Sequence, residues 1–268
     1  MAEASLAHGY EYIGITDHSK TAHYAGGLTI GEIEQQQDEI DRLNAGFGDR
    51  FHIFNGIESD ILPDGSLDYP DDVLRRFDFI IGSIHGQFRL DRQAQTERLV
   101  RAVSNPLITV IGHMTGRQLL RRPGYDMDIE RVLAACAEHG VAVEVNGNPW
   151  RLDLDWRWLR RGIELGCKFS INPDAHSTSE IASSTRWGLA IARKSGMPAD
   201  RVINTLETGT HSHAGCSRGK SGLGRARRPP VTLGCFAALS SFRAGRFPRC
   251  GLALLGASLA VAPGALPQ

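Results

Sequence analysis

Short apolar runs alternate with longer amphipathic stretches along the first 207 residues. The runs are typical of buried strands and lie at 10–16, 51–57, 77–84, 107–112, 141–146 and 168–172. Between them the pattern predicts helices over 28–44, 91–103, 128–139, 155–165 and 179–194. In the first of these helices Ile30, Ile33, Ile40 and Leu43 share one face, and Thr29 and Glu32 stand in capping-box register. Six strands that alternate with helices predict a parallel sheet or a barrel.

Residues of the metal-ligating types stand where each of these strands would end. They are His18, Glu58, His85 and His113 after the first four runs, and Asp174 and His176 after the sixth. In a parallel barrel the carboxyl ends of the strands converge on one face, where such folds build their active sites. We therefore expect these six side chains to meet at a common rim.

Four imidazoles and two carboxylates suit divalent ions such as Zn, Mn or Fe better than Ca. One glutamate can bridge two ions, and such a cluster lowers the pKa of bound water and clamps the oxygens of a phosphoester. A single histidine at a strand end is more often a hydrogen-bonded structural residue. Four of the eight histidines before residue 207 occupy successive strand ends, which favours a metal site that hydrolyses phosphoesters.

Further polar residues near the predicted rim suggest supporting roles. Asp17 and Asn146 could orient ligands from behind, whereas Asp60 could do no more than cap a turn. Four basic residues follow ligand-bearing strands closely enough to reach a phosphate: Lys20, Arg89, Arg117 and Arg151. The alternative for each of them is a solvated surface charge.

Charge divides the chain into two regions. Residues 1–207 carry 22 Lys and Arg against 30 Asp and Glu, whereas 208–268 carry eight basic residues and no acid. We predict that this Gly-, Pro- and Ser-rich tail is disordered or reads as an out-of-frame translation. Its His211 and His213 lack a flanking apolar strand and are not expected to bind metal. The apolar stretch at 251–262 is too short to span a bilayer comfortably.

Five cysteines without a CxxC pair, and no secretory signal before them, indicate reduced thiols in the cytoplasm.

Several motifs together resemble the PHP (polymerase and histidinol phosphatase) domain, in particular the version at the C-terminus of bacterial family X DNA polymerases. They are ITDHSK, GGLT, GIESDILPDGSLDYPDDVL, FDFIIGSIH, LDR, IGHMTGR, NGNPWRLDL and INPDAHST, within residues 2–206. The resemblance implies a distorted (β/α)7 TIM-like barrel with up to three Mn or Zn ions. It places the same six side chains on metal-ligand positions, with Glu58 as the bridging carboxylate and Glu58 and Asp174 activating water between the ions.

The resemblance also implies an upstream strand with an HxH motif and a further acidic ligand, and this chain starts after both. We therefore expect three of nine ligands and the first barrel strand to be absent. Two strand edges would be exposed, and the domain would bind fewer ions and show weak activity.

The leading hypothesis is a metal-dependent 3′-5′ exonuclease or DNA end-processing module of a DNA-repair polymerase. Its partners would be DNA 3′ ends or another phosphoester, with no membrane and no protein partner. Because residues 1–207 are acidic, contact with DNA would depend on metals and local arginines. One alternative is a small-molecule phosphatase of the histidinol-phosphate type. Another is a non-catalytic metal-binding remnant, and the basic tail could bind nucleic acid nonspecifically.

Overall fold

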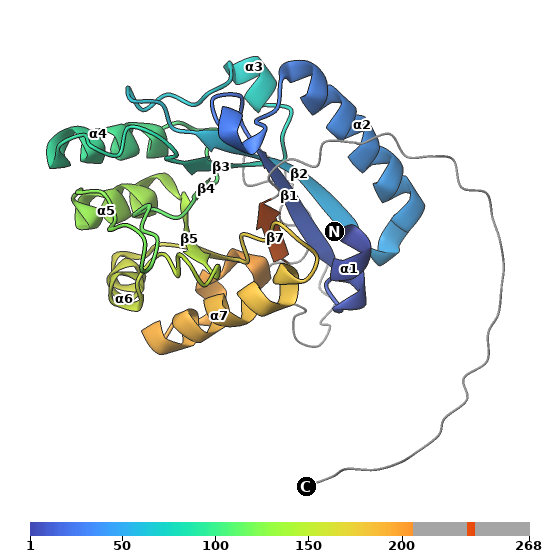
Figure 1. Cartoon of the computed structure of the whole chain (residues 1–268). Coiled ribbons are helices and arrows are strands. Elements are labelled where there is room, and N and C mark those ends of the chain that lie inside the picture. The colour runs from blue at the N-terminus through green and yellow to red at the C-terminus, as the bar shows by residue number, and fades with distance from the viewer. Residues whose placement is uncertain (206–234, 239–268) are drawn as a thin grey trace, which may run out of the picture.

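Strands and helices alternate along the part of the chain that this computed structural model describes, residues 1–205 and 235–238 (Figure 1). The strands are β1 (Tyr12–His18), β2 (His52–Asp60), β3 (Phe79–Ser83), β4 (Val110–Ile111), β5 (Ala142–Asn146), β6 (Phe169–Asn172) and β7 (Cys235–Ala238). The helices are α1 (Ala2–Ala7), α2 (Ile30–Phe47), α3 (Asp71–Leu74), α4 (Arg92–Val103), α5 (Ile129–His139), α6 (Trp156–Leu165) and α7 (Glu180–Ser195). All six predicted strands and all five predicted helices are confirmed.

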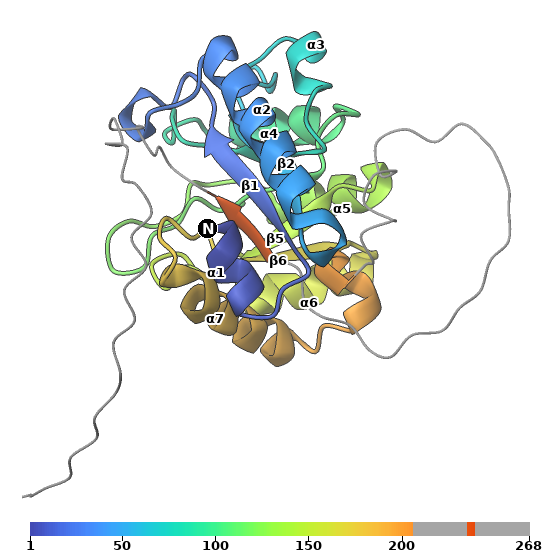
Figure 2. The same cartoon turned by 90° about the vertical axis from the view of Figure 1, so that its right-hand side faces the viewer.

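The strands form one parallel sheet in the order β6-β5-β4-β3-β2-β1-β7. Strands β1 to β6 curl into a half-barrel, and α2, α4, α5, α6 and α7 lie on its outside (Figures 1 and 2). The predicted parallel α/β fold is thus confirmed in the form of a half-barrel. None of the helices among the described residues is both long and apolar enough to cross a membrane.

The predicted capping box at the start of α2 is present. The Glu32 backbone N–H donates to the Thr29 hydroxyl at 3.4 Å, and the Thr29 N–H donates to the Glu32 carboxylate at 2.8 Å. The rest of the domain covers only the middle of the predicted apolar face of α2. Ile33 and Ile40 are buried there, whereas Ile30 and Leu43 near the two ends are exposed. The helix therefore packs through its centre.

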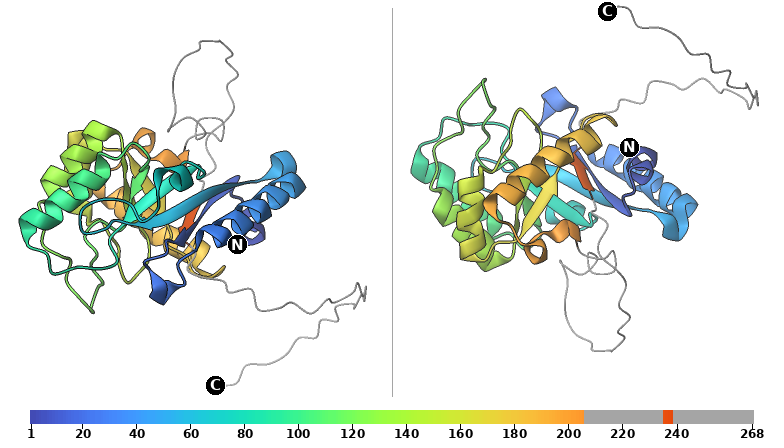
Figure 3. Two further views of the ribbon diagram at one scale, coloured as in Figure 1. Left: turned by 90° about the horizontal axis from the view of Figure 1, so that it is seen from above. Right: turned by 90° about the horizontal axis from the view of Figure 1, so that it is seen from below.

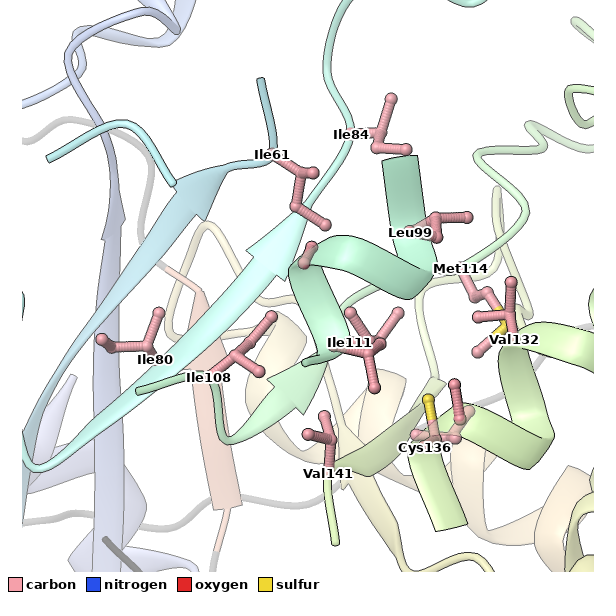
Figure 4. Close-up of a cluster of buried hydrophobic side chains, with 14 of the residues drawn as sticks. Ile61, Ile80, Ile84, Leu99, Ile108, Ile111, Met114, Val132, Cys136 and Val141 are labelled. Atoms are coloured by element: carbon pink, nitrogen blue, oxygen red, sulfur yellow. The ribbon is translucent and has the colours of Figure 1, made fainter. Parts of the chain in front are cut away.

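The main core fills the space between the sheet and the outer helices (Figure 4). Ile80 of β3 and Ile111 of β4 pack there with side chains of α4 and α5 such as Leu99 and Val132. Burying each aliphatic side chain of this size stabilises the fold by about 1.5–3 kcal/mol. Cys136 is a buried free thiol in the same cluster, which agrees with the predicted reduced cysteines.

A second apolar cluster fills the inside of the half-barrel below the strand ends. Tyr12, Phe54 and Phe79 belong to it, and residue alternation places Tyr12 and His18 on one face of β1 and Phe54 and Glu58 on one face of β2. Gly56 lies between Phe54 and Glu58, and a Cβ there would come within 2.3 Å of the Phe79 ring. This glycine lets an aromatic ring pack directly beneath the polar strand ends.

Strand β7 comes from the tail that the sequence predicts to be disordered. It pairs in parallel with β1, with Ile13 opposite Cys235 and Thr16 opposite Ala238, and it lies close to β6 (Figure 3). The β1 edge that we expected to be exposed is therefore paired. The rest of the tail, including His211, His213 and the stretch at 251–262, lies outside the described residues.

Replacing both Phe236 and Ala237 with Pro is expected to lower the free energy of unfolding by about 1–2 kcal/mol, because proline removes the backbone N–H that pairs with β1. Urea unfolding of the full chain measures the change, and Ala257→Pro elsewhere in the tail is the control. Equal stability of all three proteins would show that β7 does not support the sheet.

Candidate metal centre

Glu58 lies at the centre of a ring of imidazoles at the carboxyl ends of the strands. Its side chain is only 3% exposed, and β2 pairs with β1 so that Glu58 stands opposite His18. His18 Nδ1 lies 3.4 Å from Glu58 Oε2, His85 Nε2 lies 3.4 Å from Oε1, and His113 Nε2 lies 3.0 Å from Oε1. The His18 and His85 rings stand edge to face, with centroids 4.7 Å apart. Four of the six predicted ligands therefore meet around one carboxylate.

The donor atoms of this ring fit a divalent cation. One ligand atom each from His18, Glu58 and His85 can be chosen so that all three lie within 4.8 Å of one another. His18 Nδ1 and His85 Nε2 are buried and make no hydrogen bond, which is costly for polar atoms unless another partner binds them. Imidazole nitrogen and carboxylate oxygen are ligands that Zn and Mn accept.

Asp60 fixes the orientation of His85. Its Oδ1 lies 2.6 Å from His85 Nδ1, so that the opposite ring nitrogen faces Glu58, and the Thr21 hydroxyl donates to Asp60 Oδ2 at 2.5 Å. A carboxylate behind a ligand histidine is a common arrangement at metal sites. The sequence suggests no more than a turn cap for Asp60, whereas its carboxylate contacts His85 and Thr21 and is placed to orient the ligand candidate His85.

Burial and the neighbouring charges shift the pKa values of His85 and His113 in opposite directions. Burial alone lowers the pKa of His85, but the charge of Glu58 and the bond to Asp60 outweigh it and raise this pKa to about 9. Burial lowers the pKa of His113 to about 4, so this ring is neutral and ready to bind a cation. Burial raises the pKa of Glu58, yet His18 and His85 hold it well below its usual range.

Asp174 and His176 lie beside this ring, but other groups contact them. Asp174 Oδ2 accepts hydrogen bonds from Asn146 Nδ2 at 3.0 Å and from Arg151 Nε at 3.1 Å. His176 is exposed, and its Nδ1 lies 3.0 Å from the Asp174 carbonyl oxygen. Asp174 has a φ of 49° and His113 a φ of 23°, in the left-handed region that non-glycine residues enter mainly where the surroundings impose it, often at functional sites.

The other predicted residues have varied surroundings. Asp17 directly precedes His18 in β1, so the two side chains point to opposite faces of the sheet. On the outer face, Asp17 accepts a hydrogen bond from Gln36 of α2. Lys20 is exposed and lies 5.7 Å from the centre of the Tyr69 ring. Arg89 is exposed. Arg117 Nε donates to the Arg151 carbonyl at 3.0 Å, so this guanidinium ties two rim loops together.

Sequence reasoning missed Glu144, which is buried on the inner face of β5. Its carboxylate accepts hydrogen bonds from the His113 backbone N–H at 2.5 Å, from Asn146 Nδ2 at 3.2 Å and from Asn172 Nδ2 at 2.8 Å. Burial and the nearby charge of Asp174 raise the pKa of Glu144 to about 8. The one signal in the sequence is an acid inside the apolar run VAVEVN, two residues before Asn146.

Comparisons with known proteins find relatives of this chain. No family model matches the chain. The chain is 43% identical over 204 residues to the DNA polymerase/3′-5′ exonuclease PolX of Bacillus subtilis, which covers 76% of this chain and 35% of that protein. It is 26% identical over 215 residues to a protein of Thermoanaerobacter sp. described as a probable phosphatase, covering 76% of this chain and 82% of that one.

Among solved structures, histidinol phosphate phosphatase of Lactococcus lactis, complexed with Zn, L-histidinol and phosphate, has the same fold. The TM-score is 0.53 at 22% identity, over 73% of this chain and 86% of that one.

The pKa of His85 predicts how pH affects the metal-free protein. Because this pKa is raised from 6.5 to about 9, the folded state keeps a proton that the unfolded state loses, so stability declines as pH rises from 6.5 through 9.

A metal ion must displace the same proton from His85, so the affinity of the protein for the ion rises between pH 6.5 and 9 by up to about tenfold per pH unit. Asp60→Asn is expected to move this rise in Mn²⁺ affinity to lower pH, because the variant lacks the carboxylate that raises the pKa of His85. Calorimetric titration with Mn²⁺ at several pH values measures the affinity, and a pH-independent affinity would contradict the prediction.

At pH 9, above the raised pKa of Glu144, the change Glu144→Gln is expected to lower the free energy of unfolding of the metal-free protein by about 1–3 kcal/mol. The reason is that one oxygen of the ionised carboxylate, which accepts hydrogen bonds from N–H groups, becomes an NH2 group that cannot accept them. Urea unfolding measures the loss, with Glu138→Gln on the exposed side of α5 as the matched control. Equal losses in both variants would show that the three hydrogen bonds contribute nothing specific.

Proposed function

The chain belongs to the PHP family, and from that membership we propose that residues 1–207 form a metal-dependent phosphoesterase that removes nucleotides from DNA 3′ ends. The observation that carries the proposal is the ring of His18, His85 and His113 around the buried Glu58, in which imidazole nitrogens from three strand ends lie 3.0–3.4 Å from the oxygens of one carboxylate. Imidazole nitrogens and a carboxylate gathered in this way are the donor types that a divalent cation shares. Mn and Zn are the proposed ions.

A bound ion of this kind supplies an acidified water and neutralises charge on a phosphate oxygen. The side chains of the chain prepare the place for it. Asp60 holds His85 in the orientation that directs its Nε2 inward, and Glu58 offers two oxygens to imidazoles on different strands. Glu58 and Asp174 are the carboxylates that we propose position the attacking water.

Asp174 and His176 are proposed as further ligands, with Asn146 holding Asp174 in place through its amide. Arg151 now pairs with Asp174 at 3.1 Å. We propose that this guanidinium turns to the substrate phosphate when Asp174 binds a cation, because an arginine serves a phosphate as well as a carboxylate. Lys20 and Arg89 are exposed and free to approach the same phosphate, whereas Arg117 acts through the loop that it holds.

DNA is favoured over a small phosphomonoester as the substrate. The relative at 43% identity is a polymerase/exonuclease, whereas the histidinol phosphate phosphatase shares the fold at 22% identity. Since the chain spans about a third of the Bacillus protein, the activity of that whole protein is not carried over. The cytoplasm is the proposed location, since DNA is the proposed substrate.

A histidinol-phosphate-type phosphatase is the second enzymatic candidate, favoured by the shared fold alone. A non-catalytic metal-binding domain is the third candidate. It is favoured by the ion pair between Asp174 and Arg151, which occupies one of the two carboxylates proposed to position the attacking water.

The test compares Mn²⁺-dependent release of nucleotides from a 3′-recessed DNA duplex with release of phosphate from histidinol phosphate, using the full chain. Glu58→Gln is expected to lower kcat/KM for DNA by at least about 100-fold, because it replaces the charged carboxylate at the centre of the imidazole ring with a neutral amide, which binds a cation more weakly. Glu138→Gln is the control. Turnover of histidinol phosphate alone would select the second candidate, and metal binding without turnover of either substrate would select the third.

A further inference from the structure

One loop at the mouth of the metal centre exposes apolar and basic side chains together. It runs over 116–124, and we refer to it, with Trp150 beside it, as the rim arm. Leu120 is fully exposed with a φ of 62°, and Trp150 is 48% exposed. Exposed large apolar groups are normal when they are scattered singly, but two that share one site rim indicate a binding surface.

Arginines lie against the aromatic rings of this surface. The Arg121 guanidinium stands 4.0 Å from the centre of the Trp150 ring, and the Arg122 guanidinium stands 4.2 Å from the centre of the Phe88 ring. The sequence from Arg98 to Tyr125 contains no acid, although residues 1–207 are acidic overall. The rim arm is therefore a local cationic surface on an acidic domain.

The rim arm is connected to the metal centre by short contacts. The Leu119 N–H donates to the Trp150 carbonyl at 2.6 Å, and Trp150 is followed by Arg151, whose Nε donates to Asp174. Close to the ligands themselves, Tyr24 is 75% exposed, with its ring centroid 6.4 Å from that of His18 and 6.5 Å from that of His85. An exposed aromatic ring therefore lies beside the metal-ligand candidates, and another, Trp150, belongs to the arm.

Two hollows border the loop, with volumes of ≈ 430 Å³ and ≈ 500 Å³. Both are shallow and open to solvent. Their linings share Arg122, Pro123 and Gly124, and neither includes a metal-ligand candidate. A small phosphate ester held at the metal centre is too short to reach beyond it along the loop, whereas a chain of nucleotides is long enough to do so.

We propose that the rim arm binds a single strand of DNA next to the nucleotide being removed, with a base stacked on the Trp150 ring, a neighbouring base in apolar contact with Leu120, and phosphates against Arg121 and Arg122. Surfaces that bind single strands without sequence preference combine aromatic platforms with a cationic track in this way. The inference rests on the proposed phosphoesterase function and adds that the arm makes the site prefer a polymeric strand. Tyr24 would receive the terminal base.

The experiment uses the full chain and a double variant, Arg121→Ala with Trp150→Ala. The matched control is Arg186→Ala with Trp187→Ala, an exposed pair on α7 in which the guanidinium lies 5.5 Å from the centre of a ring that is 45% exposed. The substrates, with Mn²⁺, are a 5′-labelled twelve-nucleotide oligothymidylate and thymidine 5′-(4-nitrophenyl phosphate). The readout is the ratio of kcat/KM for the oligonucleotide to kcat/KM for the small diester.

The double variant is expected to lower this ratio by about tenfold, and the control pair is expected to leave it unchanged. An unchanged ratio in the double variant, or an equal fall in the control, would overturn the proposal. Every protein keeps residues 208–268, so the basic tail contributes equally throughout.

Fluorescence anisotropy of the labelled oligonucleotide with metal-free protein separates the two proposals. If neither substrate is turned over, the phosphoesterase proposal fails. The rim arm is still supported when the double variant binds about tenfold more weakly than the control, and it is refuted when the two bind equally.

Discussion

The candidate site depends on one constraint: a buried carboxylate has to be matched by polar partners from separate strands. Glu58 lies in the dry interior of a parallel sheet, where an unpaired charge is prohibitively costly. Parallel pairing places His18 directly opposite it, and the next two strands deliver His85 and His113 to the same carboxylate. The stability of the sheet and the chemistry of the site are therefore linked, since a shift of register in any of these strands would separate the carboxylate from its imidazoles.

The arrangement beneath the ring serves the same constraint. Gly56 leaves room for the Phe79 ring directly under Glu58, so the floor of the site is aromatic and buried. Electrostatic interactions are stronger in such a water-poor environment than in solvent. The opposite pKa shifts of His85 and His113 follow from this, because one ring has two carboxylates beside it and the other has burial as its dominant influence.

The sequence predicts the strands because each is a continuous apolar run. It also predicts that four side chains meet, because a polar residue follows each of the first four runs: His18, Glu58, His85 and His113. What it does not predict depends on how loops and distant strands fold back. Glu144 becomes a partner of the His113 backbone only when β4 and β5 pair, and Arg117 is turned away from the centre by a loop conformation that no periodicity encodes. Strand β7 escapes prediction because four residues in a Gly- and Pro-rich tail carry no recognisable pattern.

The pairing of β1 with β7 has a consequence for biosynthesis. Residues 13 and 235 are neighbours in the sheet, yet nearly the whole chain separates them. During translation β1 leaves the ribosome long before its outer neighbour exists, while β2 follows it soon afterwards. Pairings across such long sequence separations form slowly, since the entropy of closing the loop is lost before any contact forms. The nascent domain thus assembles outward from β1 and β2, and the free edge of β1 is paired only once β7, more than two hundred residues later in the chain, has been synthesised.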